Sequence, residues 1–435
     1  MALGGGSFTV QNKELPGAYI NFVSAACANA ALSERGICTM PLELDWGVEG
    51  EVFEVSGEEL QKNSKEIFGY DYGHDKLKGL RDLFLNARKL YAYRVNGGGA
   101  KAANALAEAL YGGVRGNDLS ISVAVNADDE KLFDVITLLD GARVDVQTAA
   151  GTEELVPNKF VKWKKGAALS AAASLPLTGG ENGEVTGGSY QAYLDKIESY
   201  SFNVMGSAAS DETVKRLLVS FNRRMREEMG VKFQLALYRC AADYFGVVSV
   251  QNSVKDSGFG EGSLVYWAAG ALAGCGINRS LQNRVYDGGF KVDTDYTQTE
   301  LKKAVGSGQF ILHKAGAEVR VLADINSMVT PSDTQGQVFR ENQTVRVMDQ
   351  IANDIAVLFS TKYLGAVPND KAGRVSLWSD IVKHHRQLGE IGAIEDFSDS
   401  DVTVEQGEDR KSVVVTDKIT VANAMSKVYM TVTVA

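Results

Sequence analysis

The sequence contains few of the residues from which metal sites and histidine-based catalytic sites are built. Among its 435 residues only four are histidine and four are cysteine. No cysteine stands in a CxxC pair, so the sequence indicates neither a zinc knuckle nor a disulfide framework, and we expect reduced thiols made in a cytoplasm. The cysteines are Cys27, Cys38, Cys240 and Cys275. The sequence therefore predicts no metal and no cofactor.

Long apolar runs and an excess of basic charge are also absent. No stretch reaches the roughly 18 to 20 apolar residues that cross a bilayer. The first residues lack a basic region followed by an apolar run, so we expect neither a signal peptide nor direct membrane insertion. The formal net charge of −10 argues against nucleic acid as a partner, because neutralising phosphates requires a basic surface. A protein partner fits this composition better.

Motifs that cradle phosphate or activate a nucleophile are missing. Despite 45 glycines there is no GxxxxGK[ST] and no strand-linked GxGxxG, and no serine stands in a GxSxG elbow. The nearest candidate is the glycine-rich stretch 257–263 before a predicted helix, but Glu261 would repel an anion there. We interpret it as a loop with helix-capping residues. The sequence thus predicts a protein that is not an enzyme; an α/β hydrolase with a dispersed site is the alternative.

Two polar clusters on predicted helices could in principle form sites. His384 and His385 are adjacent, so on a helix they point in different directions and cannot share a metal as an i, i+4 pair does. Asp380 stands four residues before His384, but we interpret this helix face as solvated. The basic cluster 222–226 has the same interpretation, with the alternative that it meets an acidic patch on another subunit.

Glycine-rich segments divide the chain, whose length predicts two to four domains. Between 96–99 and 179–183, short alternating strands predict a small sandwich or barrel. Within this stretch, the alanine and leucine content of 100–110 favours a helix on propensity alone. From there to Thr330 helices and strands alternate, which predicts an α/β domain with a central sheet. Two helices and a hairpin follow.

Strand patterns without a local hairpin partner stand near both ends. A lone strand leaves its backbone N–H and C=O groups unpaired, so it must join a sheet in its own chain or in a neighbour's. Both alternatives stay open at this point. Residues 24–32 connect the first strand to the core, either as an extended linker or as a short buried helix. The strand residues are Tyr19, Ile20, Asn21, Phe22 and Val23, and Val428, Tyr429, Met430, Thr431, Val432, Thr433 and Val434.

Several short segments along the chain form a recognisable series. They are PGAYINF at 16–22, GGVRGND at 112–118, NKFV at 158–161, LTGG at 177–180, KYLG at 362–365, the stretch from GAI at 392 to residue 404, and KVYMTVTV at 427–434. Individually the segments are weak signals, but their order along essentially the whole chain is specific. In these segments the chain resembles the tail sheath family of contractile phages and related bacteriocins, of the Gram-positive prophage type.

The resemblance implies a fold with α/β and β domains. It implies an α+β core domain formed by both chain ends, a subtilisin-like α/β domain without a catalytic triad, and an outer β-sandwich or barrel domain with strands in 100–110. The expected ranges are an N-terminal arm at 1–24, the first part of the core domain at 25–96, the outer β domain at 97–178, the subtilisin-like domain at 179–330, and the rest of the core domain with its strand arm at 331–435.

The resemblance also implies how the protein works. The strands at both ends would add to neighbouring subunits, in a helical stack of six-fold rings around a tail tube. Contraction would be a one-way repacking of subunits that drives the tube through the target envelope without nucleotide hydrolysis. The expected partners are further copies, the tube, the baseplate and the tail terminator, in a virion tail or bacteriocin particle assembled in the host cytoplasm. A tube or baseplate component is the remaining alternative.

Overall fold

The computed structural model describes residues 32–434. The predicted N-terminal strand, Tyr19 to Val23, lies outside these residues, as does most of the predicted connector 24–32. The chain divides into two units. The described part of unit 1 comprises residues 32–38, 79–88 and 199–434, and unit 2 comprises residues 39–78 and 89–198.

Parallel strands in the order β13-β12-β11-β10 lie at the centre of unit 1. Their residues are almost all buried and form apolar runs rather than an alternation, as is typical of strands covered on both faces. Helix α5 packs on β10 and β11, and α4 packs on β11. The bounds are β10 (Val204–Ser207), α4 (Glu212–Glu227), β11 (Gln234–Tyr238), β12 (Val247–Val250), α5 (Leu264–Gly274) and β13 (Gln309–Phe310).

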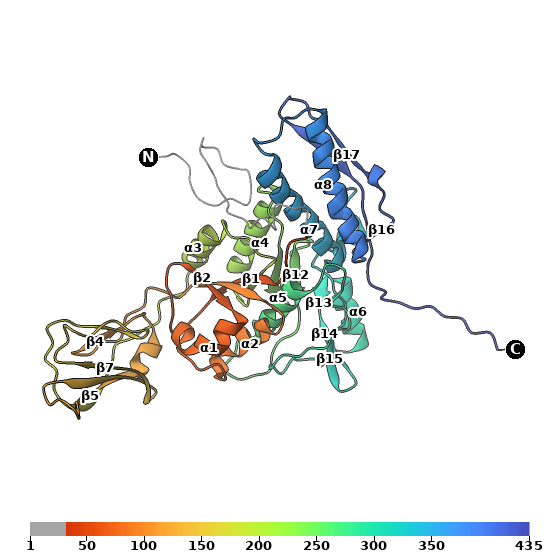
Figure 1. The fold of residues 1–435 in the computed structure, drawn as a ribbon. Helices are drawn as coiled ribbons and strands as arrows, with labels where there is room; N and C mark the ends of the chain where they lie inside the picture. The colour runs from red at the N-terminus through yellow and green to blue at the C-terminus, as the bar shows by residue number, and fades with distance from the viewer. Residues whose placement is uncertain (1–31, 435) are drawn as a thin grey trace. The chain divides into compact units, whose positions relative to one another are not determined.

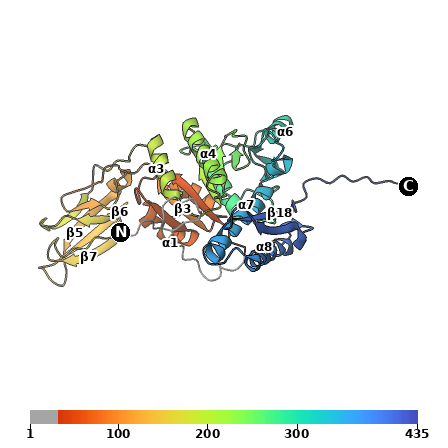
Figure 2. The same cartoon turned by 90° about the horizontal axis from the view of Figure 1, so that it is seen from above.

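The remaining elements of unit 1 are mostly helices and two-stranded sheets. Helices α7 and α8 and the hairpin β17–β18 are seen together in Figure 2. Strand β16 pairs with β19, and β17 with β18. The bounds are α2 (Lys78–Phe84), α6 (Gln298–Gly306), β14 (Leu312–Ala315), β15 (Glu318–Val321), α7 (Asn342–Leu358), a π-helical turn (Phe359–Tyr363), α8 (Lys371–Glu390), β16 (Ile394–Glu395), β17 (Val402–Gln406), β18 (Val413–Asp417) and β19 (Thr420–Val421).

The sequence pattern predicts a hairpin of 310–313 with 318–323, and this prediction is only partly right. Strands β14 and β15 form an antiparallel pair, with Leu312 opposite Val321. Phe310, however, belongs to the parallel sheet, where it is opposite Val250 and completely buried. A buried aromatic side chain in the sheet gains more from that position than from an exposed hairpin end.

Unit 2 begins with strands in the order β1-β3-β2. Ser56 caps α1 and forms a capping box with Glu59, which satisfies two of the free N–H groups at the helix start. Tyr193 on α3 shares a hydrogen bond of 2.8 Å with Thr39. The bounds are β1 (Ile37–Leu42), β2 (Val52–Ser56), α1 (Gly57–Phe68), β3 (Lys89–Arg94) and α3 (Gly187–Ile197).

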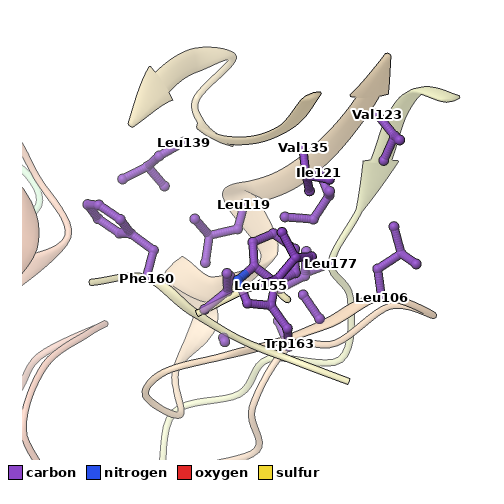
Figure 3. Close-up of a cluster of buried hydrophobic side chains, with 14 of the residues drawn as sticks. Leu106, Leu119, Ile121, Val123, Val135, Leu139, Leu155, Phe160, Trp163 and Leu177 are labelled. Atoms are coloured by element: carbon purple, nitrogen blue, oxygen red, sulfur yellow. The ribbon is translucent and has the colours of Figure 1, made fainter. Parts of the chain in front are cut away.

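The middle of unit 2 consists of a four-stranded antiparallel sheet, β7-β6-β5-β9, and a two-stranded sheet, β4-β8. Alternate residues of β5 point into one hydrophobic core, including Leu119, Ile121 and Val123. Figure 3 shows these side chains in one cluster with Phe160 and Trp163. The bounds are β4 (Ala107–Ala109), β5 (Leu119–Val125), β6 (Phe133–Leu139), β7 (Ala142–Ala149), β8 (Val161–Trp163) and β9 (Ala172–Pro176).

The prediction of a helix at 100–110, which rested on propensity alone, is wrong. This segment ends in β4, which pairs antiparallel with β8, and Ala103 bridges to Thr178. The Asn104 side chain accepts the N–H groups of Leu106 and Ala107 and so turns the chain into the strand. Small alanines fit the crowded sheet contact, and this tertiary pairing outweighs a weak local preference.

The basic cluster 222–226 is not a solvated face throughout. Arg226 is buried and makes a bidentate ion pair with Asp349 of α7 at 2.6 and 2.7 Å. Burial acts to lower the pKa of Arg226, but attraction and hydrogen bonding to the carboxylate outweigh burial and raise it. The side chain of Asn222 is also buried and donates to the Phe233 carbonyl. The prediction failed because one face of α4 packs inward while Arg223 faces out.

We expect Asp349→Asn to destabilise unit 1 by about 3–5 kcal/mol, because the change leaves the buried Arg226 charge without its counter-ion. The measurement is the urea midpoint of unfolding. Arg386→Gln serves as the control, because its ion pair with Asp399 is exposed on the surface and such pairs contribute about 0–1 kcal/mol. Equal effects of the two changes would contradict this account of the Arg226 pair.

Candidate assembly interface

The predicted C-terminal strand pairs with no strand in the part of the chain that the structure describes. Residues 425–434 belong to no sheet there and lie in solvent. Val428 is 88% exposed and Val434 is 89% exposed. Figure 1 shows the segment as the extended blue trace that ends at the label C. Hereafter we call residues 425–434 the arm.

The arm keeps the pattern of a half-buried strand although no described residue covers it. In an extended chain Val428, Met430, Val432 and Val434 lie on one face, while Tyr429, Thr431 and Thr433 lie on the other. The four apolar side chains of the first face are each at least 68% exposed. A contiguous exposed apolar stripe of this kind marks an interaction surface.

The arm starts from a fixed root. Gln343, in the first turn of α7, donates to the Ala422 carbonyl and accepts from the Ala424 N–H, both at 3.0 Å. The Thr344 and Asn423 side chains bond to each other, and the Ala422 N–H donates to the Ala393 carbonyl. The chain is therefore held as far as Ala424 and leaves the surface after it.

Strand β17 has an edge that no strand within residues 32–434 covers. Hydrogen bonds from the Gly407 N–H to the Ser412 carbonyl and from the Lys418 N–H to the Asp401 carbonyl fix the register of the hairpin β17–β18. In this register odd-numbered residues of β17 bond to β18, and the N–H and C=O groups of the even-numbered residues point away from it. The even-numbered residues are Val402, Val404 and Gln406.

The groove beside this edge lies between β17 and α8 and has a volume of about 510 Å³. Its apolar lining comes from both elements: Val375 and Trp378 on α8, and Val402 and Val404 on β17. Trp378 Nε1 donates to the Val402 carbonyl at 2.9 Å. Val375 is 55% exposed, so part of this apolar lining is uncovered in the single chain. An open strand edge beside apolar side chains has the chemistry of a strand acceptor.

The interpretation of the histidine pair as a solvated face is wrong. His384 and His385 are both buried, because α8 turns this face toward α7 and β18. His384 pairs with Asp354, and His385 pairs with Asp417. Asp380 bonds instead to Lys362 and Tyr363. The two rings therefore face separate carboxylates.

Other kinds of site find no support in the residues that the structure describes. Between residues 32 and 434 no three His, Cys, Asp or Glu side chains gather as metal ligands do. No helix in that range has the length and hydropathy needed to cross a membrane. At the glycine-rich stretch 257–263, Glu261 accepts a hydrogen bond from Tyr238 at 3.0 Å. What the described residues do offer is an exposed arm with the pattern of a strand and an open strand edge.

Comparison with known proteins gives the family. Four family models match consecutive parts of the chain: the tail sheath domain III N-terminal region at 35–95, the phage tail sheath beta-sandwich domain at 96–182, the phage tail sheath central domain at 183–327, and the phage tail sheath C-terminal domain at 334–435. Protein XkdK of the phage-like element PBSX of Bacillus subtilis is 30% identical over 99% of this chain and 100% of its own length.

Solved structures of tail sheath proteins are also similar to this chain. The sheath tail protein of Desulfitobacterium hafniense is 32% identical, with a TM-score of 0.83, over 95% of this chain and 99% of that one. The helical sheath of the anti-feeding prophage in its contracted state shares the fold alone, at 12% identity and a TM-score of 0.55 over 97% of this chain and 99% of that one. The chain belongs to the phage tail sheath protein family. It is a structural subunit of a tail sheath with a mixed α/β multidomain fold, and not an enzyme, as the sequence predicted.

The open edge of β17 is the feature that sequence reasoning missed. The sequence pattern, with alternation at 402–405 and 412–416 on either side of the turn 407–409, correctly predicts the hairpin β17–β18. Nothing in the sequence shows that the outer edge stays uncovered, since any other strand of the chain could have paired with it. No local pattern could therefore have identified the acceptor.

We expect Gln343→Ala to loosen the root of the arm. The change removes two hydrogen bonds to the backbone, each worth about 1 kcal/mol, so hydrogen exchange at the Ala424 amide should accelerate on the order of tenfold or more. Gln337→Ala, at an exposed position, should leave that rate unchanged. An unaltered rate in Gln343→Ala would show that the root is held by other contacts.

Proposed function

We propose that the arm adds as a strand to the open edge of β17 in a neighbouring subunit, and that this links copies into a helical sheath around a tail tube. The observation that carries the proposal is the presence of an unpaired strand and an uncovered strand edge among the described residues of one chain. A donor and an acceptor that lie at different places on the subunit give head-to-tail contacts, which generate open helical assemblies.

The backbone chemistry of the two surfaces matches. The N–H and C=O groups of Val404 and Gln406 offer donors and acceptors at the spacing of a strand. Residues 428–434 carry no charge that would have to be desolvated when they pair. Strand addition of this kind takes its affinity from main-chain hydrogen bonds and its specificity from pockets for alternate side chains.

The side chains of the arm also suit the groove. Met430 and Val432 would lie over Val375 and Trp378, and a flexible thioether adapts to an irregular apolar groove better than a β-branched side chain does. Met430 is 79% exposed and Val432 is 68% exposed in the single chain, so both have apolar surface to lose on pairing. Each large apolar side chain buried in this way contributes roughly 1.5–3 kcal/mol.

The N-terminal strand, Tyr19 to Val23, is proposed to join a neighbouring subunit as well. The hairpin has a second edge, on β18, that no strand within residues 32–434 covers, and the register turns the backbone groups of Val413 and Val415 there away from β17. One hairpin with two open edges has room for two strands from other subunits. Linking each subunit through both ends would let subunits move without dissociating.

The finer description of the domains is part of the proposal. Unit 1 combines residues 32–38 with the C-terminal half of the chain, which supports a core domain formed by both chain ends. The parallel strands β10 to β13 with their packed helices support a subtilisin-like α/β domain at 179–330. The two sheets of 97–178 support an outer β-sandwich domain.

Contraction is proposed to be a one-way repacking of subunits that drives the tube through the target envelope. The likeness of the fold to a sheath in its contracted state supports this. The proposed partners are further copies in six-fold rings, the tail tube, the baseplate and the tail terminator, with no role for nucleic acid or membrane insertion. The proposed location is a phage tail or a bacteriocin particle assembled in the host cytoplasm.

We expect deletion of residues 428–435 to abolish tube formation while leaving the subunit folded, because the exposed arm adds little to the core. The free energy of unfolding should change by no more than about 0.5 kcal/mol. Electron microscopy and urea unfolding are the measurements. A matched pair tests the face of the strand: Val432→Lys should block assembly and Thr431→Lys should not. Normal tubes from the deleted chain would refute the role of the arm.

Proline substitutions separate the two edges of β17. Gln406→Pro removes an N–H that points outward, so we expect an intact hairpin but impaired tube assembly. Glu405→Pro removes an N–H that bonds to β18 and should unfold the hairpin itself. Hydrogen exchange of β18 reports on the hairpin, and electron microscopy reports on the tubes. If Gln406→Pro assembles normally with an intact hairpin, the acceptor is another edge.

A further inference from the structure

Trp378 occupies one end of the open edge of β17. Its indole Nε1 donates to the Val402 carbonyl at 2.9 Å. The register of the hairpin turns that carbonyl away from β18, toward the side on which an added strand would lie. The indole nitrogen therefore takes the place that a backbone N–H of an added strand would need at this oxygen. At Val404 and Gln406 the same edge is covered by no strand within residues 32–434.

The packing around Trp378 holds its indole in this position. The side chain is half-buried and packs against an apolar cluster that includes Leu377, Ile381 and Val402. It projects from the middle of α8, and it lines the groove together with Val375. A side chain packed in this way stays in one rotamer, because another rotamer would give up its contacts. The block at the Val402 carbonyl is therefore a fixed feature of the hairpin.

The alternation of the arm limits how the arm can pair with β17, but it does not select one register. A slip by one residue would turn the apolar face, with Met430 and Val432, from the groove to solvent. A slip by two residues keeps the apolar face on the groove and moves the arm by roughly 7 Å along β17. In a helical assembly all links between subunits have to be equivalent, so a further feature must choose among these registers.

We propose that Trp378 sets the register of the arm by closing the edge of β17 at Val402. This inference rests on the proposed function, in which the arm of another subunit adds to β17. A register that brings an N–H of the arm to the Val402 carbonyl leaves that N–H without an acceptor inside the new sheet. A register that ends its pairing at Val404 avoids the loss.

The experiment reads the register by disulfide trapping in assembled tubes. A full-length chain with Val404→Cys is mixed with a chain that carries one cysteine on the apolar face of the arm. Oxidation links residues that face each other, because their Cβ atoms lie about 4.5–5.5 Å apart, whereas the next residues on the same face lie about 7–8 Å away. Mass spectrometry of peptides distinguishes these links from the four native cysteines. The arm variants are Val428→Cys, Met430→Cys, Val432→Cys and Val434→Cys.

With Trp378 in place we expect one arm position to link to Val404→Cys, preferred roughly tenfold or more over the others. Trp378→Phe keeps an apolar ring but frees the Val402 carbonyl, so a second position, two residues away, should also link. Trp163→Phe is the matched control, because Trp163 Nε1 donates to the Val156 carbonyl within unit 2, and it should leave the single position unchanged.

The outcomes separate this inference from the proposed function. The same single position in Trp378→Phe, or two positions in the chain that keeps Trp378, would overturn the role of Trp378 and leave the pairing of the arm with β17 intact. No link at any arm position would overturn that pairing, and the role of Trp378 with it.

A second measurement leaves Trp378 unchanged. The chain has four tryptophans, and a 15N-tryptophan label allows hydrogen exchange of the Trp378 indole N–H to be compared by NMR between single subunits and tubes. If the indole stays on the Val402 carbonyl, its exchange in tubes should be no faster than in the single subunit. Faster exchange on assembly would mean that the arm displaces the indole, and it would overturn the proposal even if Trp378→Phe did not assemble.

Discussion

The backbone hydrogen bonds that the arm does not make with residues 32–434 are the constraint on which the molecule depends. A strand with alternating apolar residues leaves its N–H and C=O groups in water unless another strand pairs with them. Among residues 32–434 no strand pairs with the arm, and the edge of β17 that faces away from β18 is also unpaired. The described residues therefore form a folded subunit in which the backbone groups of the arm and of the β17 edge lack strand partners. Association of copies would satisfy both surfaces together.

The rest of unit 1 holds the root of the arm and the edge of β17 in fixed positions. Gln343, in the first turn of α7, holds the chain at Ala422 and Ala424. The same helix is tied to α4 by the buried Arg226–Asp349 pair. Helix α8 carries Trp378, which holds the Val402 carbonyl, and the two histidines that reach carboxylates on α7 and β18. A pull on the arm would thus act on helices that are anchored in the core.

Most helices and strands could be predicted from periodicity, including α4, α7, α8 and the hairpin β17–β18. The failures share a physical cause, which is that burial depends on the tertiary structure. Residues 100–110 favour a helix locally but pair with β8. His384, His385 and Arg226 are polar residues that the sequence places on solvated faces, but each meets a carboxylate from a distant segment. The arm was predictable because its alternation is local, whereas its open acceptor edge was not.

The most direct test mixes two chains, both lacking residues 1–24. One also lacks residues 428–435, and the other carries Gln406→Pro, so that the first lacks the donor arm and the second has a blocked β17 edge. Light scattering gives the mass of each chain and of the mixture. Our account predicts monomers for each chain alone and a 1:1 complex on mixing. A mixture that remains monomeric would contradict the pairing of the arm with β17.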